Sequence, residues 1–253
     1  MPVKPLSPDE IKKMRFICRL AARTLAYAGS FVKEGITTDE LDKLVYDYTL
    51  TNNARPACLG YHGYPKTICT SVNEVVCHGL PNDYKLKNGD ILNIDVTSEK
   101  EGFFGDCSAT FTVGEVSETA LDLIEVAKIA RDRGIEVVKP GATTGDIGFV
   151  TDKFVTRRGY TTVKEIGGHG IGRIFHDEPF VPAYGKRGRG EILVPWQCIT
   201  VEPMVNEGVE DFIEVEIPNS TIKYYATADK KLSAQFEHTI LVTDTGHEIL
   251  TID

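Results

Sequence analysis

Acidic side chains alternate with apolar ones along two neighbouring stretches of the chain. In residues 91–97, Asp95 shares one face of a predicted strand with Asn93 and Thr97, because successive side chains of a strand point to opposite faces. Residues 103–113 repeat the pattern and place Asp106 on the polar face. If residues 99–102 form a four-residue loop, the two strands make a hairpin in which Asp95 lies directly opposite Asp106.

Two carboxylates directly opposed in a hairpin repel one another. Such a pair is tolerated if one group is protonated, as in an acid/base dyad, or if a cation lies between them. The alternative is a register shifted by one or two residues, which would leave two separate, solvated aspartates. The hairpin alone does not decide between these interpretations.

The second half of the chain offers further ligand-type residues. The predicted strand 198–203 ends its polar face at Glu202, and the predicted strand 236–243 presents Glu237. Four carboxylates carry a formal charge of −4, which two divalent cations would neutralise. His169 lies in a glycine-rich segment that disfavours a helix and allows close backbone approach, although a lone histidine is more often structural. Oxygen-rich ligation with one imidazole would favour Mn, Fe, Co or Zn.

Helix-capping patterns mark the elements that must position these residues. Ser7 with Glu10, and Thr37 with Glu40, form capping boxes that predict helices beginning at Pro8 and Thr38. Apolar spacing predicts two further helices, over about 121–138 and 144–158. Strands follow each pair of helices, at 91–97, 103–113, 198–203, 212–217 and 236–243. This order predicts an α/β (α+β) fold.

A short pattern occurs twice, 106 residues apart. Residues 33–38 and 139–144 both read K-x-G-x-T-T, and each copy joins the end of one predicted helix to the start of the next. Glycine and threonine are ordinary turn and cap residues, so coincidence is the alternative. We expect an internal duplication, with repeats of about 6–113 and 117–250 in a single catalytic domain of residues 1–253.

Composition narrows the class of protein. The 253 residues are 42% hydrophobic, which allows a sizeable core and excludes wholesale disorder. A net charge of −9 argues against nucleic acid or an anionic membrane as the main partner. No apolar run approaches a membrane span, and the six cysteines form no CxxC pair. We therefore expect a cytoplasmic protein with reduced thiols.

Five ligand-type residues, taken in order and in their contexts, resemble the methionine aminopeptidases. The contexts are Asn93-Ile-Asp95-Val, Phe104-Gly-Asp106-Cys-Ser, Gly168-His169-Gly170-Ile-Gly, Val201-Glu202-Pro203 and Ala234-Gln-Phe-Glu237-His-Thr. The match runs from about residue 6 to the end of the chain. It implies the pita-bread fold, with internal pseudo-two-fold symmetry, and a site for two divalent metal ions. Asp106 and Glu237 would bridge both metals, Asp95 would complete one, and His169 with Glu202 the other.

The resemblance also implies an activity, which is removal of the initiator methionine from nascent proteins with a small second residue. A hydroxide bridging the metals would attack, and Glu202 would accept and later donate the proton. His78 would contact the scissile peptide nitrogen, and His176 the carbonyl oxygen. The methionine pocket would be formed by Cys58, Tyr61, His62, Tyr64, Cys69 and Phe175. A monovalent cation would be held by Asn73, Val75 and Ser233.

The implied partners are nascent polypeptide N-termini at the ribosome, with no nucleic acid or membrane bound directly, and a monomeric enzyme. Prolidase and aminopeptidase P share the ligands but are longer, with an additional N-terminal domain. Type 2 methionine aminopeptidases carry an insertion in the second half. The 68 residues from His169 to Glu237 leave little room for it, which favours type 1. A metal-free binding protein on this fold is the alternative from another class, although its ligand set is usually broken.

Four positions depart from the family pattern. Phe104 stands where relatives often have a polar residue, Cys107 where threonine is common, and Trp196 where glycine is usual. Strand periodicity places Cys107 on the face opposite Asp106. The tryptophan often found at the pocket rim is missing, and we expect Tyr224 or Tyr225 in its place.

Overall fold

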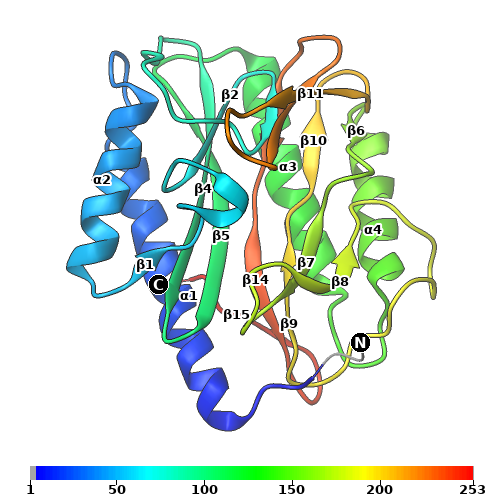
Figure 1. The fold of residues 1–253 in the computed structure, drawn as a ribbon. Coiled ribbons are helices and arrows are strands. Elements are labelled where there is room, and N and C mark those ends of the chain that lie inside the picture. Colours follow the sequence, from blue (N-terminus) through cyan, green and yellow to red (C-terminus); the bar gives the residue numbers. More distant parts are fainter. Residues whose placement is uncertain (1–3, 253) are drawn as a thin grey trace.

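Two pairs of helices flank the strands of the molecule in the computed structural model, which describes residues 4–252 (Figure 1). Helices α1 (Pro8–Gly29) and α2 (Thr38–Thr51) lie on one side, and α3 (Glu118–Glu136) and α4 (Thr144–Arg157) on the other. Within the described residues, no helix is long and apolar enough to cross a membrane.

The strands form four small sheets. The first has β4 (Ile91–Lys100) paired on one edge with β5 (Phe103–Thr112) and on the other with β1 (Arg55–Pro56) and β2 (Cys69–Val72). The largest has the order β15-β14-β9-β7-β8, with β7 (Gly168–Ile171), β8 (Asp177–Val181), β9 (Cys198–Val201), β14 (His238–Val242) and β15 (His247–Ile249). Two three-stranded sheets have the orders β13-β10-β6 and β11-β12-β3. Their strands are β3 (Val75–Cys77), β6 (Thr161–Thr162), β10 (Met204–Asn206), β11 (Phe212–Glu216), β12 (Lys223–Thr227) and β13 (Ser233–Gln235).

The predicted helix starts are largely confirmed. Ser7 and Thr37 each cap a helix, with Glu10 and Glu40 completing the two capping boxes. The third helix begins earlier than expected, at Glu118, where the Ser117 side chain accepts a backbone N–H. Leu121, expected in its buried stripe, is 53% exposed. The buried face follows Ala120, Leu123, Val126, Ala127 and Ala130 instead.

The two K-x-G-x-T-T segments have the same local structure. Gly35 and Gly141 take φ values of 87° and 82°, a left-handed conformation that glycine adopts at little cost. Thr37 and Thr143 then cap α2 and α4, each with a reciprocal acidic partner three residues on. Each threonine also pairs with a distant extended segment, at Lys85 and Ile192 respectively. The sequence pattern therefore marks equivalent turns in the two halves.

The predicted register of the β4–β5 hairpin is wrong by two residues. Glu101 and Gly102, with φ values of 53° and 76°, form a two-residue turn in place of the expected four-residue loop. Positive φ at both central residues suits the twist of the flanking strands. Asp95 consequently lies opposite Ser108, and Asp106 opposite Thr97. A shift of two keeps every side chain on its original face, so both aspartates still share one face.

The sheet that contains β4 and β5 is hydrogen-bonded to the chain at β13 and β14, and these strands carry or adjoin the acidic residues. The Glu237 N–H donates to the Ser108 carbonyl at 3.0 Å, and the Thr239 hydroxyl donates to the Asp106 carbonyl at 2.8 Å. Asn93 and Thr110 side chains both donate to the Gln235 carbonyl, at 2.9 and 2.8 Å. These bonds between residues 125 to 142 positions apart hold the halves of the chain in fixed relation.

Candidate metal centre and substrate cavity

The five predicted ligands line a single cavity of about 140 Å³. Asp95 lies on β4, Asp106 on β5 and His169 on β7, while Glu202 directly follows β9 and Glu237 directly precedes β14. Two sheets therefore bring together side chains that are up to 142 residues apart in the sequence. The solvated aspartates of the alternative interpretation are excluded, because both aspartates lie in this cavity and Asp106 is only 4% exposed.

The ligand atoms converge closely. One atom each of Asp106, His169 and Glu237 lie within 4.8 Å of one another. The His169 Nε2 is 3.6 Å from Glu202 Oε1 and 3.9 Å from Asp106 Oδ2. These separations are too long for direct hydrogen bonds, and they leave room for an ion between the groups.

Neighbouring polar side chains fix the orientation of the carboxylates. Thr97 donates its hydroxyl to Asp106 Oδ1 at 2.8 Å. Thr200 donates to Glu202 Oε1 at 2.7 Å, and Gln235 donates to Glu202 Oε2 at 3.1 Å. Such partners hold a ligand in one rotamer before the metal arrives.

The His169 ring is bonded so that its Nε2 faces the carboxylates as an acceptor. Its Nδ1 lies 3.0 Å from the Gly170 carbonyl oxygen, which can only accept, so the proton resides on Nδ1. Burial lowers the pKa of His169 to about 4, which keeps the ring neutral near pH 7. A neutral imidazole with a free Nε2 lone pair is the form that ligates metals.

Burial and mutual repulsion raise the pKa values of the clustered carboxyl groups. The pKa of Asp95 rises to about 7, first through burial and then through the charge of Glu202. Burial also raises the pKa of Glu202 to about 7. The pKa values of Asp106 and Glu237 are raised well above the usual range by the same two causes. The cluster is therefore costly to ionise without a compensating positive charge.

The residues present fit divalent cations. Asp95 Oδ1 and Glu237 Oε1 are buried without a hydrogen-bond partner among the described residues, although buried polar atoms normally have one. The donors are four carboxylates and one imidazole, which is the ligand chemistry of Mn, Fe, Co or Zn. Cations between the ligands would satisfy the unpaired oxygens and neutralise the charge.

Two further predicted histidines, His78 and His176, also line the cavity. His78 follows β3 with a φ of 56°, and its Nδ1 lies 3.2 Å from the Lys223 carbonyl oxygen. His176 Nδ1 lies 3.0 Å from the Tyr61 hydroxyl, and its ring centroid is 4.3 Å from that of His169. Burial lowers the pKa of both rings, so both are neutral near pH 7.

The predicted side-chain pocket is assembled with one exception. The cavity is lined by Cys58, Tyr61, Tyr64, Cys69 and Phe175. His62, which we expected there, is exposed and is absent from the described residues that line the cavity. Its ring contacts Tyr61 edge-on from outside, with centroids 4.5 Å apart.

Three lining residues were not anticipated: Ile166, Gly167 and Ile222. Gly167 belongs to the glycine-rich segment around His169, so the segment itself was a usable signal. Ile166 and Ile222 lie in irregular segments with no periodic pattern to place them. Asn73 and Ser233, predicted to hold a monovalent cation, are joined by a Ser233 N–H donated to the Asn73 carbonyl at 2.9 Å. A cation there stays a prediction.

The departures from the family pattern have structural explanations. Phe104 stacks on Phe175 with an interplanar angle of 9°, which extends the aromatic wall of the cavity. Cys107 is 1% exposed and is not among the described lining residues, in agreement with its predicted face. Trp196 has a φ of 67°, which explains why glycine suits this position in relatives.

Neither Tyr224 nor Tyr225 of β12, expected in place of the missing rim tryptophan, is among the described residues that line the cavity. Tyr224 packs with the apolar residues that form the cavity wall. Tyr225 instead contacts the His78 ring, with centroids 5.8 Å apart.

The fold and this ligand cluster define a class of metal-dependent peptidase, and comparison with known proteins agrees. Residues 12–244 match the model of Metallopeptidase family M24, so the chain belongs to that family and has its pita-bread fold. It is similar to two bacterial methionine aminopeptidases, each 46% identical. The Rickettsia prowazekii protein matches over 100% of this chain and 96% of its own length, and that of Escherichia coli K12 over 100% and 95%.

Solved structures show the same relationships. A methionine aminopeptidase crystal structure from Rickettsia prowazekii has a TM-score of 0.95, covering 99% of this chain and 100% of its own. The Pyrococcus horikoshii prolidase, 23% identical, has a TM-score of 0.77 and covers 98% of this chain but only 63% of its own. The prolidase thus shares the fold.

Proposed function

We propose that the protein is a methionine aminopeptidase that removes the initiator methionine from nascent proteins whose second residue is small. The observation that carries this proposal is the single cavity in which the five ligand-type residues meet a wall of thiol and aromatic side chains. Sulfur and aromatic groups make favourable contacts with a thioether.

The ligand set supports two divalent ions. Asp95, Asp106, His169, Glu202 and Glu237 would hold them. When bound, such ions lower the pKa of a coordinated water and polarise the scissile carbonyl. Mn, Fe, Co and Zn all suit these donors.

Glu202 would move the proton of the reaction. Its two oxygens are held by Thr200 and Gln235, and burial raises its pKa to about 7 in the absence of cations. A carboxylate with a fixed orientation beside the attacking water can accept the proton and later deliver it to the departing amine.

The two cavity histidines would hydrogen-bond to the two ends of the scissile peptide group, His78 to its nitrogen and His176 to its carbonyl oxygen. The Lys223 carbonyl keeps the proton of His78 on Nδ1, so Nε2 can accept the scissile N–H. Tyr61, whose pKa is raised by burial, stays protonated and can donate to His176 Nδ1. His176 would then carry its proton on Nε2. That N–H would donate a hydrogen bond to the substrate carbonyl oxygen as negative charge develops there.

A peptide assay tests the proposal. Methionine release from a Met-Gly-Met-Met peptide should require an added divalent metal and should be nearly abolished in Asp106→Asn and His78→Ala. Cleavage of Xaa-Pro peptides in place of methionyl peptides would favour a prolidase-type activity. Metal and peptide binding without turnover would favour a binding protein on this fold. The same proposal includes four further points. They are action at the ribosome, a cytoplasmic location, a monomeric state, and a single catalytic domain of two related halves.

A further inference from the structure

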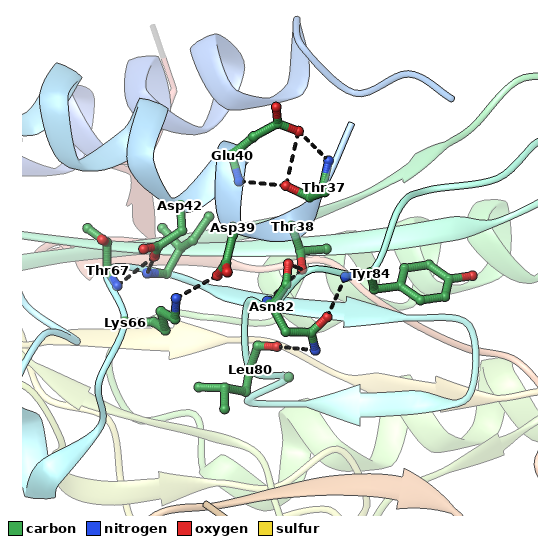
Figure 2. A network of polar contacts seen from close by, with 12 residues as sticks. Thr37, Thr38, Asp39, Glu40, Asp42, Lys66, Thr67, Leu80, Asn82 and Tyr84 are labelled. Atoms are coloured by element: carbon green, nitrogen blue, oxygen red, sulfur yellow. Dashed lines mark hydrogen bonds and ion pairs between the residues drawn. The ribbon is translucent and has the colours of Figure 1, made fainter. Parts of the chain in front are cut away.

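The N-terminal half of α2 is bonded to the segment that carries one wall of the cavity (Figure 2). Asp42 Oδ1 accepts the N–H groups of Thr67 at 2.7 Å and of Ile68 at 3.2 Å. None of the described residues of α2 lines the cavity itself. Asp42 therefore acts on the cavity through residues 67–68 and does not line it.

From those two amides the contacts lead directly to cavity residues. Cys69 follows Ile68 and lines the cavity. The hydroxyl of Tyr64, another lining residue, lies 3.1 Å from the Ile68 carbonyl oxygen and 3.0 Å from that of Gly79. Gly79 in turn follows His78. The segment held by Asp42 thus supports the thiol and aromatic wall and the loop that carries His78.

The Asp42 bonds should support this segment more than the nearby ion pair between Asp39 and Lys66 does. Asp42 is half-buried, and burial raises its pKa while the bonds from Thr67 and Ile68 oppose that rise. Both bonds are charge-assisted, and losing the acceptor would leave the Thr67 and Ile68 amides without partners. Asp39 and Lys66 form an ion pair at 2.5 Å nearby, but their partly exposed side chains make its contribution small.

We propose that Asp42 is a positioning residue for the methionine pocket. Through the amides of residues 67 and 68 it fixes the wall that contacts the side chain of the substrate's N-terminal residue. It touches neither substrate nor metal, so its loss should weaken binding of that side chain and leave metal binding intact. This inference rests on the proposed function, because it assigns the wall to the methionine side chain.

The test uses the metal-loaded full chain and the variants Asp42→Ala and Asp42→Asn. Asp42→Ala should raise KM for the methionyl peptide about tenfold and lower kcat by a smaller factor, because the loosened wall contacts the substrate side chain directly and supports the loop that carries His78 indirectly, through Tyr64. Asp42→Asn keeps an acceptor oxygen of the same shape, so KM should rise only about threefold. The Kd of free L-methionine, measured by calorimetry, should rise in the same order.

The matched control is Asp47→Asn, which removes a carboxylate from the same helix. Asp47 pairs with Lys43 at 2.8 Å on the exposed face, so KM and the Kd of methionine should match the wild type. Mn²⁺ titration should give wild-type affinity and stoichiometry in all the variants.

Two results would overturn the inference alone, with an active wild type. One is a KM in Asp42→Asn equal to that of Asp47→Asn, which remains informative if Asp42→Ala fails to fold. The other is a loss of Mn²⁺ affinity or kcat with KM unchanged. A wild type that releases no methionine with any metal would contradict the proposed function and this inference together.

Discussion

At the residue scale, the cavity combines groups that are unfavourable on their own. Asp95 Oδ1 and Glu237 Oε1 are buried without partners, and burial raises the pKa values of the carboxyl groups around them. Thr97, Thr200 and Gln235 nevertheless hold Asp106 and Glu202 in fixed orientations. An arrangement that is costly when empty and already oriented is what a preformed cation site requires.

His176 offers a prediction at the same scale. His176→Ala should lower kcat about a hundredfold or more and change KM little, because a donor to the developing oxyanion acts mainly in the transition state. Steady-state kinetics on a methionyl peptide measures both constants. His247→Ala is the control, since His247 lies outside the cavity with Nδ1 2.9 Å from the Val138 carbonyl oxygen. An equal kcat in the two variants would remove His176 from the mechanism.

Much of the site could be predicted from residue types and order, but its geometry could not. Alternation in residues 91–97 places Asp95 correctly on a face, and the shift of register leaves that face unchanged. His62 lies next to the pocket residue Tyr61 in the sequence. Its φ of 48° in a short 3₁₀ turn nevertheless leaves it exposed. Ile222 enters the cavity through tertiary packing, which no local pattern encodes.

At the element scale, local signals worked where side chains bond to their own backbone. Ser7, Thr37 and Thr143 all cap helices in the structure, since a capping box involves only residues three apart. The β4–β5 loop was predicted wrongly because Glu101 was not expected at a φ of 53°. A two-residue turn usually carries asparagine, aspartate or glycine at that position, so a glutamate there is a weak signal for such a turn.

The paired turns provide a prediction about stability. Thr37→Ala and Thr143→Ala should each lower the free energy of unfolding by about 1 kcal/mol, because each removes the side chain that caps a helix. Urea denaturation of the two variants beside Thr156→Ala provides the comparison. The Thr156 hydroxyl donates to the Asp152 carbonyl within α4 and caps no helix start. If neither cap variant is less stable than that control, the two threonine caps do not contribute to the free energy of unfolding, and the prediction is wrong.

At the scale of the whole molecule, the cavity lies where the two halves of the chain meet. Glu237 and Thr239 of the second half bond to the backbone of Ser108 and Asp106 in the first. Charge in the cavity therefore acts on the contact between the halves, and stability should depend on the ionisation of the cluster.

The pH dependence of the metal-free protein follows from this placement. The pKa values of Asp95 and Glu202 are about 7 in the folded chain, well above the ordinary values near 4. Between about pH 4 and pH 7 the folded chain binds more protons at these two groups than the unfolded chain does. Their contribution to the free energy of unfolding therefore falls as pH rises over this range. The buried His169 and His176 act in the opposite direction, because their lowered pKa values favour folding as pH rises. The carboxyl contribution is therefore isolated by comparison: between about pH 4 and pH 7, the Tm of the chelator-treated wild type should fall relative to that of Asp106→Asn, measured by calorimetry.

Divalent metal should reverse that loss. Cations that bind only the folded chain stabilise it by mass action, so Mn²⁺ added at about pH 8 should raise Tm. Asp106→Asn removes one charge from the cluster, so its metal-free form should show a shallower pH dependence and a smaller response to Mn²⁺. A Tm that is independent of both pH and metal in the wild type would show that the carboxylates are not clustered in solution.

The most direct test of the central claim is methionine release from Met-Gly-Met-Met under chelation and after re-addition of Mn²⁺, Co²⁺ or Fe²⁺. We expect no release with chelator, recovery with at least one of these metals, and near-complete loss in Asp106→Asn. Release that persists under chelation, or an Asp106→Asn variant as active as the wild type, would contradict it.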